Sequence, residues 1–258
     1  MSSHRANMMR LLAEARGESG KSLCVLGAGN ANDIDLAVLA HDFERIALVD
    51  LDERSLELAT ERLSEDARRR VEQHAPVDLT SIVSILGGWE ADTAPPEADI
   101  SAAINAAKAA RPPDVGAFDV VASTCVLSQL IDSIYMRLAT THPQCQELVM
   151  AVRNRHLEMM VELLNPGGVG LLITDFVATE TAPELAHIDD RLVPAAAARW
   201  INERNFFTGA NPYAIRDCFQ NLNGAGRTVE NVQVSPAWRW DMGAKQLAVS
   251  AVTFRRGG

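Results

Sequence analysis

The stretch Val25-Leu-Gly-Ala-Gly-Asn-Ala31 joins a short apolar run to a helical pattern near the start of the chain. The run before it, residues 22–26, is typical of a buried parallel strand, and we expect a helix from about residue 33 to residue 41. Glycine tolerates positive φ and lets a backbone approach a ligand closely, so Gly27-Ala28-Gly29 predicts a loop of the nucleotide-binding type. By itself this loop also fits an ordinary tight turn between a strand and a helix.

An acidic residue at the end of the next apolar run strengthens the nucleotide-binding interpretation. Residues 45–50 are typical of a second strand and end in Asp50, about 20 residues after the glycine loop. A carboxylate at that place can accept hydrogen bonds from both hydroxyls of a ribose. The alternative is a helix-capping role for Asp50 or Asp52, and for Asp52, just before the helix expected over 53–70, capping is the better explanation.

The remaining pattern predicts one α/β domain over residues 1–258. A helix is expected over 5–16, and the sheet is predicted to be seven-stranded, mostly parallel and doubly wound, with helices on both faces and an antiparallel last strand. Helical or loop excursions are expected near 87–116 and 180–228. The further predicted strands are 71–79, 118–123, 168–175, 229–234 and 246–254, and the further predicted helices are 81–86, 100–110 and 146–164.

Composition limits the partners and the location of the chain. A formal charge of −10 repels phosphate backbones, so nucleic acid is a disfavoured substrate, and the Arg68-Arg69-Arg70 cluster is better explained as a solvated helix end. The four cysteines lie far apart without a CxxC pair, which indicates reduced, structural thiols and no metal site. No apolar stretch approaches the roughly 20 residues that cross a bilayer, so we expect no membrane association and a cytoplasmic location.

Two phosphate-binding loops fit the glycine turn less well. A dinucleotide site needs a third glycine, and counting from Gly27 places Asn32 there, which disfavours an NAD-dependent oxidoreductase without removing it as an alternative. A P-loop needs Lys-Ser or Lys-Thr after the turn, and neither pair follows.

Five short motifs lie along the chain in a fixed order. They are Val25-Leu-Gly-Ala-Gly-Asn-Ala31, Leu48-Val-Asp-Leu-Asp52, Ala75-Pro-Val-Asp78, Phe118-Asp-Val-Val-Ala-Ser123 and Leu163-Leu-Asn-Pro-Gly-Gly168. In this order and spacing the chain resembles the class I S-adenosylmethionine-dependent methyltransferases over most of its length. The resemblance implies a Rossmann-like fold, S-adenosylmethionine as cofactor and transfer of its methyl group.

The resemblance also implies roles for single residues. The loop would pass under the methionine part of the cofactor, Asp50 would hold the ribose, Asp78 would face the adenine amino group, and Leu51 and Leu79 would enclose the adenine ring. Ser123 and Thr124 would lie near the sulfonium, and Gln129 would face the cofactor. The residues expected to bind the cofactor are thus Gly27, Ala28, Gly29, Asn30, Asp33, Asp50, Leu51, Asp78, Leu79, Ser123, Thr124 and Gln129.

Two positions depart from the family pattern. Val25 stands where the family usually has an acid, and Ala31 stands where it has a third glycine. Asn30, Asn32 or Asp33 could replace the missing anchor of the methionine amino group, although Asp33 also fits a helix cap. These departures motivate a further alternative, a catalytically silent binding or scaffold protein with the methyltransferase fold.

The acceptor is expected to be a small molecule or a protein. The segment Ser123-Thr-Cys-Val-Leu-Ser-Gln-Leu130 resembles the fourth motif of small-molecule methyltransferases and lacks the Asn/Asp-Pro-Pro-Tyr pattern of enzymes that methylate amino groups of nucleic acids. Methyl transfer from a sulfonium depends mainly on positioning, so no catalytic triad is required. The oligomeric state stays open.

If the acceptor must lose a proton, a base is needed near it. The candidates are His142, His156, His187 and Asp175, and Asp175 is favoured because it ends the predicted fifth strand at the ligand-bearing edge. Residues 202–212 combine amides and aromatics with Gly209, which is typical of a lid, so Asn205 and Asn211 are expected to bind substrate. The alternative is a surface loop anchored by its two phenylalanines.

Overall fold

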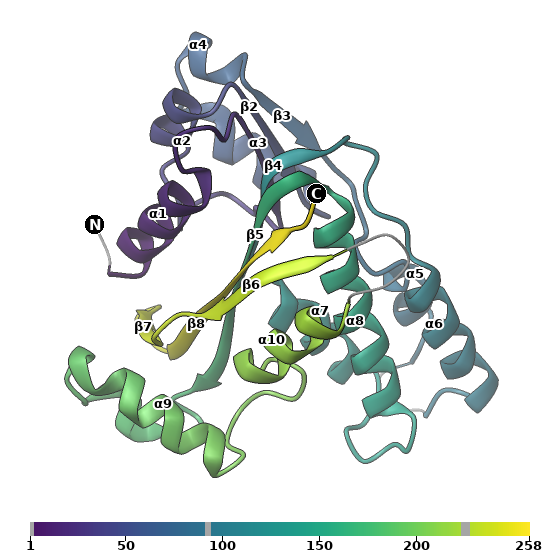
Figure 1. Ribbon diagram of the computed structural model, residues 1–258. Helices are drawn as coiled ribbons and strands as arrows, with labels where there is room; N and C mark the ends of the chain where they lie inside the picture. Colours follow the sequence, from purple (N-terminus) through teal and green to yellow (C-terminus); the bar gives the residue numbers. More distant parts are fainter. Residues whose placement is uncertain (1–2, 91–93, 223–227) are drawn as a thin grey trace.

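The computed structural model describes residues 3–90, 94–222 and 228–258. Its centre is a sheet with the strand order β3-β2-β1-β4-β5-β8-β6, and a short β7 pairs with β8 (Figure 1). The first five strands are parallel, whereas β8 is antiparallel to β5, β6 and β7. The strands are β1 Ser22–Leu26, β2 Arg45–Val49, β3 Val71–His74, β4 Phe118–Thr124, β5 Leu164–Ala178, β6 Val229–Val234, β7 Trp238–Asp241 and β8 Gln246–Arg256.

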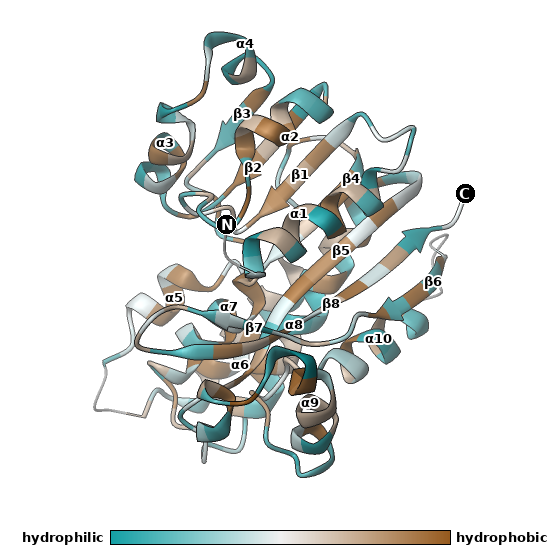
Figure 2. Ribbon diagram, turned by 90° about the vertical axis from the view of Figure 1, so that its left-hand side faces the viewer, coloured by the Kyte–Doolittle hydropathy of each residue, from teal (hydrophilic) through white to brown (hydrophobic). Residues whose placement is uncertain are grey.

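Helices cover both faces of this sheet because successive side chains of each strand point to opposite sides. In β1, Cys24 and Leu26 join the core under α6, α7 and α8, while Leu23 and Val25 join the core under α1, α2 and α3 (Figures 1 and 2). The mostly parallel, doubly wound fold with an antiparallel end is therefore confirmed. The α-helices are α1 Ser3–Arg16, α2 Leu36–Asp42, α3 Glu53–Glu61, α4 Glu65–Arg68, α5 Val83–Gly87, α6 Glu97–Ala109, α7 Val126–Tyr135, α8 Cys145–Glu162, α9 Val193–Asn202 and α10 Pro212–Asn221.

The long strands β5 and β8 extend beyond the others and carry a third, smaller core. Phe176 and Ala248 from these strands pack with Trp200 of α9. The 3-10 turns η1 Pro183–Ala186 and η2 Asp190–Leu192 lead into α9. The predicted excursions near 87–116 and 180–228 contain α6 and these later helices, and residues 91–93 and 223–227 within them lie outside the described residues.

Several element boundaries differ from the sequence-based expectations. The helix predicted over 53–70 is two helices, because the Ser64 side chain accepts a hydrogen bond from the backbone N–H of Ala67 and so caps a new one. Asp35, rather than Asp33, caps α2. The fifth strand continues past Asp175 to Ala178, where it pairs with β8. Between the predicted strands 229–234 and 246–254, where no strand was expected, Trp238–Asp241 forms an eighth strand that pairs with β8.

The first helix and β7 meet over an aromatic contact. His4 stacks on Trp240 with ring centroids 4.2 Å apart, and the indole N–H of Trp238 donates to His4 Nδ1 at 3.0 Å. Burial lowers the pKa of His4 to about 4, and it does the same for His156 in α8. Both imidazoles are therefore neutral at pH 7.

These two histidines predict a loss of stability in mild acid. Their folded pKa of about 4 lies below the usual 6.5, so the unfolded chain binds protons first and the stabilisation present above pH 6.5 is lost toward pH 4. Each histidine should contribute up to about 1.4 kcal/mol per pH unit in that window. Urea unfolding of the wild-type chain between pH 7 and 4.5 measures the slope.

A matched pair of variants separates the contribution of His4 to the pH dependence of stability from that of carboxylates that titrate in the same pH range. The amide oxygen of His4→Asn can still accept the Trp238 N–H, so this variant should flatten the slope. The exposed His187 supplies the control, His187→Gln, which should leave the slope unchanged. Equal slopes for wild type and His4→Asn would contradict a neutral, buried imidazole.

Candidate active site

The loop after β1 has backbone angles that explain its glycines. Gly27, Gly29 and Ala31 all have positive φ, at 68°, 50° and 53°. A Cβ atom built at Gly27 would lie 2.3 Å from Cβ of Val126, whereas one built at Gly29 would meet no atom within 4 Å. Gly27 therefore permits close packing against α7, and Gly29 borders open space. Ala31 occupies the position where the resembled family has glycine, and it takes the left-handed conformation that favours glycine.

Hydrogen bonds tie this loop to the ends of two neighbouring strands. The backbone N–H of Gly27 donates to Val49 O at 2.9 Å, and the Thr124 hydroxyl donates to Gly27 O at 3.1 Å. The Asp50 carboxylate accepts from the backbone N–H groups of Gly29 at 2.8 Å and Asp52 at 3.0 Å. Since an ionised carboxylate offers about four acceptor positions, Asp50 keeps capacity for the hydroxyls of a ligand.

A first cavity of about 460 Å³ opens beside Asp50. Leu51 is 48% exposed on one of its walls, and Leu79 is 6% exposed on another. The structure therefore brings together the two acids and two leucines that the sequence assigned to adenosine. The lining residues include Gly27, Gly29, Asp50, Leu51, Asp78, Leu79 and Gln129.

Asp78 also organises the backbone next to this cavity. One of its oxygens accepts from the backbone N–H of Thr80 at 2.8 Å and from the Thr80 hydroxyl, and the other accepts from the N–H of Val83 at 2.9 Å. Asp78 thus fixes the beginning of α5 while it lines the cavity. Its place is consistent with the expected role, although local bonds already use part of its acceptor capacity.

A second cavity lies on the other side of the glycine loop. Asn30, Asn32 and Asp33 line it together with Thr124, Gln129 and Trp240. Burial raises the pKa of Asp33, and the nearby Arg5 opposes that shift. His4 Nε2 lies 3.8 Å from Asp33 Oδ1, too far for a hydrogen bond.

Val25, at the place of the missing family acid, is buried in the core under α1. Its exposed fraction is 1%, and Met8 and Trp238 belong to the same core cluster. A carboxylate at Val25 would be buried among apolar groups, which is costly for a charge. Among the described residues that line the second cavity, Asp33 is the one acid.

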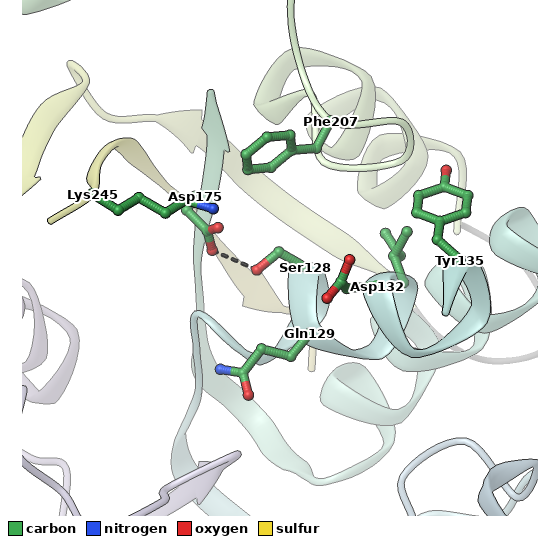
Figure 3. Close-up of a pocket in the computed structure, with 8 residues that line it drawn as sticks. Ser128, Gln129, Asp132, Tyr135, Asp175, Phe207 and Lys245 are labelled. Carbon is green, nitrogen blue, oxygen red and sulfur yellow. Dashed lines mark hydrogen bonds between the residues drawn. The ribbon is translucent and has the colours of Figure 1, made fainter. Parts of the chain in front are cut away.

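A third cavity of about 310 Å³ lies between α7, the end of β5 and the segment after α9 (Figure 3). Asp175 is only 7% exposed there, and it accepts a 2.5 Å hydrogen bond from the Ser128 hydroxyl. Burial raises the pKa of Asp175, and the Ser128 hydrogen bond opposes this effect. The cavity is lined by Ser128, Gln129, Ile131, Asp132, Tyr135, Asp175, Phe207 and Lys245.

Gln129 is a lining residue of all three cavities. Its side-chain amide donates to Cys125 O at 3.0 Å, which fixes it near the beginning of α7. Gln129 therefore borders both the cavity beside Asp50 and the cavity that contains Asp175.

Some expected site residues lie elsewhere. Ser123 is fully buried, and its hydroxyl hydrogen-bonds with His156 Nε2 at 2.8 Å in the core, so neither side chain is available to a ligand. Asn205 donates to Thr181 O at 2.9 Å, and Asn211 caps α10 by accepting from Tyr213 and Ala214. Neither asparagine lines the three cavities, and each uses one side-chain amide atom in a hydrogen bond to the backbone.

The segment 202–212 still borders the third cavity, but through different residues. Phe207 lines the cavity, and burial raises the pKa of Tyr135 on its wall, an effect that the nearby Thr208 opposes. His142 and His187 do not line it. The cavity also contains Ser128, Asp132 and Tyr135, which were not among the expected site residues. Their i, i+4, i+7 spacing places them on one face of a helix and was a usable signal.

The described residues include no group of three or more His, Cys, Asp or Glu side chains placed to hold a metal ion. None of the described helices has the length and apolar character needed to cross a membrane.

Comparison with solved structures identifies the architecture. The N-methyltransferase NodS from Bradyrhizobium japonicum WM9 is 14% identical with a TM-score of 0.51, and the match covers 99% of this chain and 97% of NodS. The methyltransferase domain of bacterial CtHen1-C is also 14% identical, with a TM-score of 0.51 and coverages of 98% and 97%. The YcgJ protein from Bacillus subtilis is 8% identical, with a TM-score of 0.52 and 99% of both chains covered. This chain has the class I methyltransferase fold.

At these identities the likeness concerns the fold alone. Comparison with models of protein families and with curated proteins found no match. The methyltransferase fold nevertheless places the glycine loop, Asp50 and Asp78 at the carboxyl edge of its parallel strands, where ligands bind in open α/β sheets.

The two loop glycines predict different consequences for substitution. Gly27→Ala should destabilise the fold by about 3 kcal/mol or more, because left-handed strain adds to a clash with Val126. Gly29→Ala should cost only the strain, about 1–2 kcal/mol. Urea unfolding of both variants measures the difference, and equal losses would show that the loop geometry is not as described.

Proposed function

We propose that this chain is a methyltransferase that binds S-adenosylmethionine and transfers its methyl group to a small molecule or a protein. The observation that carries the proposal is that Gln129 lines three cavities, one of which contains Asp50 and Asp78 and another of which contains Asp175. An adenosine group fits the first cavity, and an acceptor fits the third. The methyltransferase fold supports the choice of cofactor over NAD.

The residues of the chain divide the work of holding the cofactor. Asp50 would bind the ribose, Asp78 the adenine amino group, and Leu51 and Leu79 the two faces of the adenine ring. Gly29 leaves room for the methionine part of the cofactor. The methionine ammonium group would lie in the second cavity, beside Asp33, Asn30 and Asn32. The bound cofactor would supply an electrophilic methyl group on sulfur.

Titration of the whole chain with S-adenosylhomocysteine and with NAD tests this assignment. Calorimetry should detect micromolar binding of S-adenosylhomocysteine and no comparable binding of NAD. Tighter binding of NAD would overturn the proposal in favour of an oxidoreductase. Binding of S-adenosylhomocysteine without methyl transfer to any acceptor would favour a silent binding protein.

Substitution of the two acids should weaken binding to different degrees. Asp50→Ala should cost about 2–3 kcal/mol of S-adenosylhomocysteine affinity, because charge-assisted hydrogen bonds to the ribose are lost. Asp78→Asn should cost less, since an amide oxygen can still accept one hydrogen bond. Asp50→Asn keeps a side-chain oxygen that can accept the Gly29 N–H but lacks the charge, so it separates support of the loop from contact with the ligand. An unchanged affinity in Asp50→Ala would show that Asp50 does not contact the cofactor.

Asp175 should act on the acceptor and not on cofactor affinity. Its buried carboxylate, with a raised pKa and a Ser128 hydrogen bond, is built to take a proton from an acceptor. We expect Asp175→Asn to lower methyl transfer by about 100-fold or more while S-adenosylhomocysteine affinity stays nearly unchanged. Calorimetry and a mass-spectrometric transfer assay measure the two effects, and a parallel loss of both would place Asp175 in the cofactor site.

A further inference from the structure

The lining of the third cavity carries an excess of negative charge. Asp132 and Asp175 both line it, and Lys245 is the one cation on its wall. The Lys245 ammonium pairs with Glu180 at 3.3 Å, outside the lining residues. The four groups together therefore carry a surplus of acid.

Asp132 is the carboxylate of this cavity that is available to bind a ligand. Within the described part of the chain, its side chain has neither an ion pair nor a hydrogen bond, whereas Asp175 is held by Ser128. Asp132 and Ser128 are four residues apart on α7 and so share one face, and Figure 3 draws both on the side of the helix that faces Phe207. A cation in the cavity would lie between an exposed carboxylate and a buried one.

The rest of the wall suits the organic part of such a cation. Phe207 comes from the segment after α9, and Tyr135 and Ile131 come from α7. Aromatic faces attract a cation within about 6 Å of the ring and also pack against an apolar body. A cavity of about 310 Å³ admits a small molecule or a single side chain.

We propose that the methyl acceptor is an amine, bound as its ammonium ion between Asp132 and Asp175. This inference rests on the proposed methyltransferase function and names the acceptor class of the same site. Asp132 supplies the attracting charge, Phe207 and Tyr135 enclose the organic part, and Asp175 receives the proton that the nitrogen must lose before it can attack.

The transfer balances in atoms and charge. The ammonium nitrogen gives one proton to the Asp175 carboxylate, which becomes a neutral acid, and the nitrogen thereby gains a free electron pair. That pair forms a bond to the methyl carbon as the carbon–sulfur bond of the cofactor breaks and its electrons stay on sulfur. The products are S-adenosylhomocysteine and a protonated N-methylamine, and Asp175 then returns its proton to solvent. Burial raises the pKa of Asp175, which favours its temporary protonation.

The test compares matched ligands on protein saturated with S-adenosylhomocysteine. A panel of aromatic and aliphatic amines, beginning with 2-phenylethylamine, is titrated at pH 7.5 beside the corresponding alcohols and carboxylic acids. We expect the amines to bind at least about tenfold more tightly than their neutral and anionic partners, as an ion pair plus a cation–π contact would provide. No preference for amines across the panel would overturn the inference. A preference for carboxylates would also overturn it, because Lys245 would then be the residue that attracts the ligand.

Charge-removing variants locate the effect. Asp132→Asn should weaken amine binding about fivefold and leave alcohol binding unchanged. Asp114→Asn removes the same charge at an exposed position outside the cavity and is the control. An equal effect of both variants would show a general field of the acidic protein instead of a site. If S-adenosylhomocysteine itself does not bind, the proposed function fails, whereas binding of it without amine preference contradicts the acceptor class alone.

Discussion

The carboxylate of Asp50 holds the loop after β1 against the end of β2, and the candidate site depends on this contact. It accepts the backbone N–H of Gly29 from the loop after β1 while it stands at the end of β2, and the Gly27 N–H reaches Val49 O beside it. The left-handed backbone of the loop depends on this support, because the positive φ of Ala31 is unfavourable for a residue with a Cβ atom. The same oxygens also face the first cavity, so the group that orders the loop is positioned to contact a ligand.

Local patterns were sufficient for much of the sheet. β1 and β6 lie at the predicted bounds, because short apolar or alternating runs between turn residues leave little freedom. α7 was not predicted, since Cys125 precedes it in a left-handed conformation and offers no capping side chain to mark its start. β7 was missed for a different reason: its four residues are held by pairing with β8 and by the His4 contact, and neither is visible in a local pattern.

The candidate site divides in the same way. Acids just beyond the carboxyl ends of parallel strands converge because the fold requires it, so the positions of Asp50 and Asp78 beside one cavity could be expected from sequence. Asp175 lies within β5 and not at its end, because pairing with β8 extends that strand to Ala178. The residues that line the third cavity from the segment after α9 depend on which side chains are not already hydrogen-bonded to the backbone. Asn205 and Asn211 are already hydrogen-bonded to backbone groups, and Asn211 followed by Pro212 is a helix-start signal that points to capping. Phe207 lines the cavity in their place, and its backbone N–H donates to Phe176 O at 2.8 Å, a contact that no local pattern reveals.

The contact between α1 and β7 joins residues 234 positions apart, from Trp238 to His4, and Trp240 next to it lines the cavity beside Asp33. One wall of that cavity therefore depends on the last strands of the chain. During synthesis from the N-terminus, the glycine loop and its partner strands emerge long before β7 does. The ribosome must have made residues 238–241 before this wall can close, so a nascent chain that ends before β7 would hold the loop without its finished pocket.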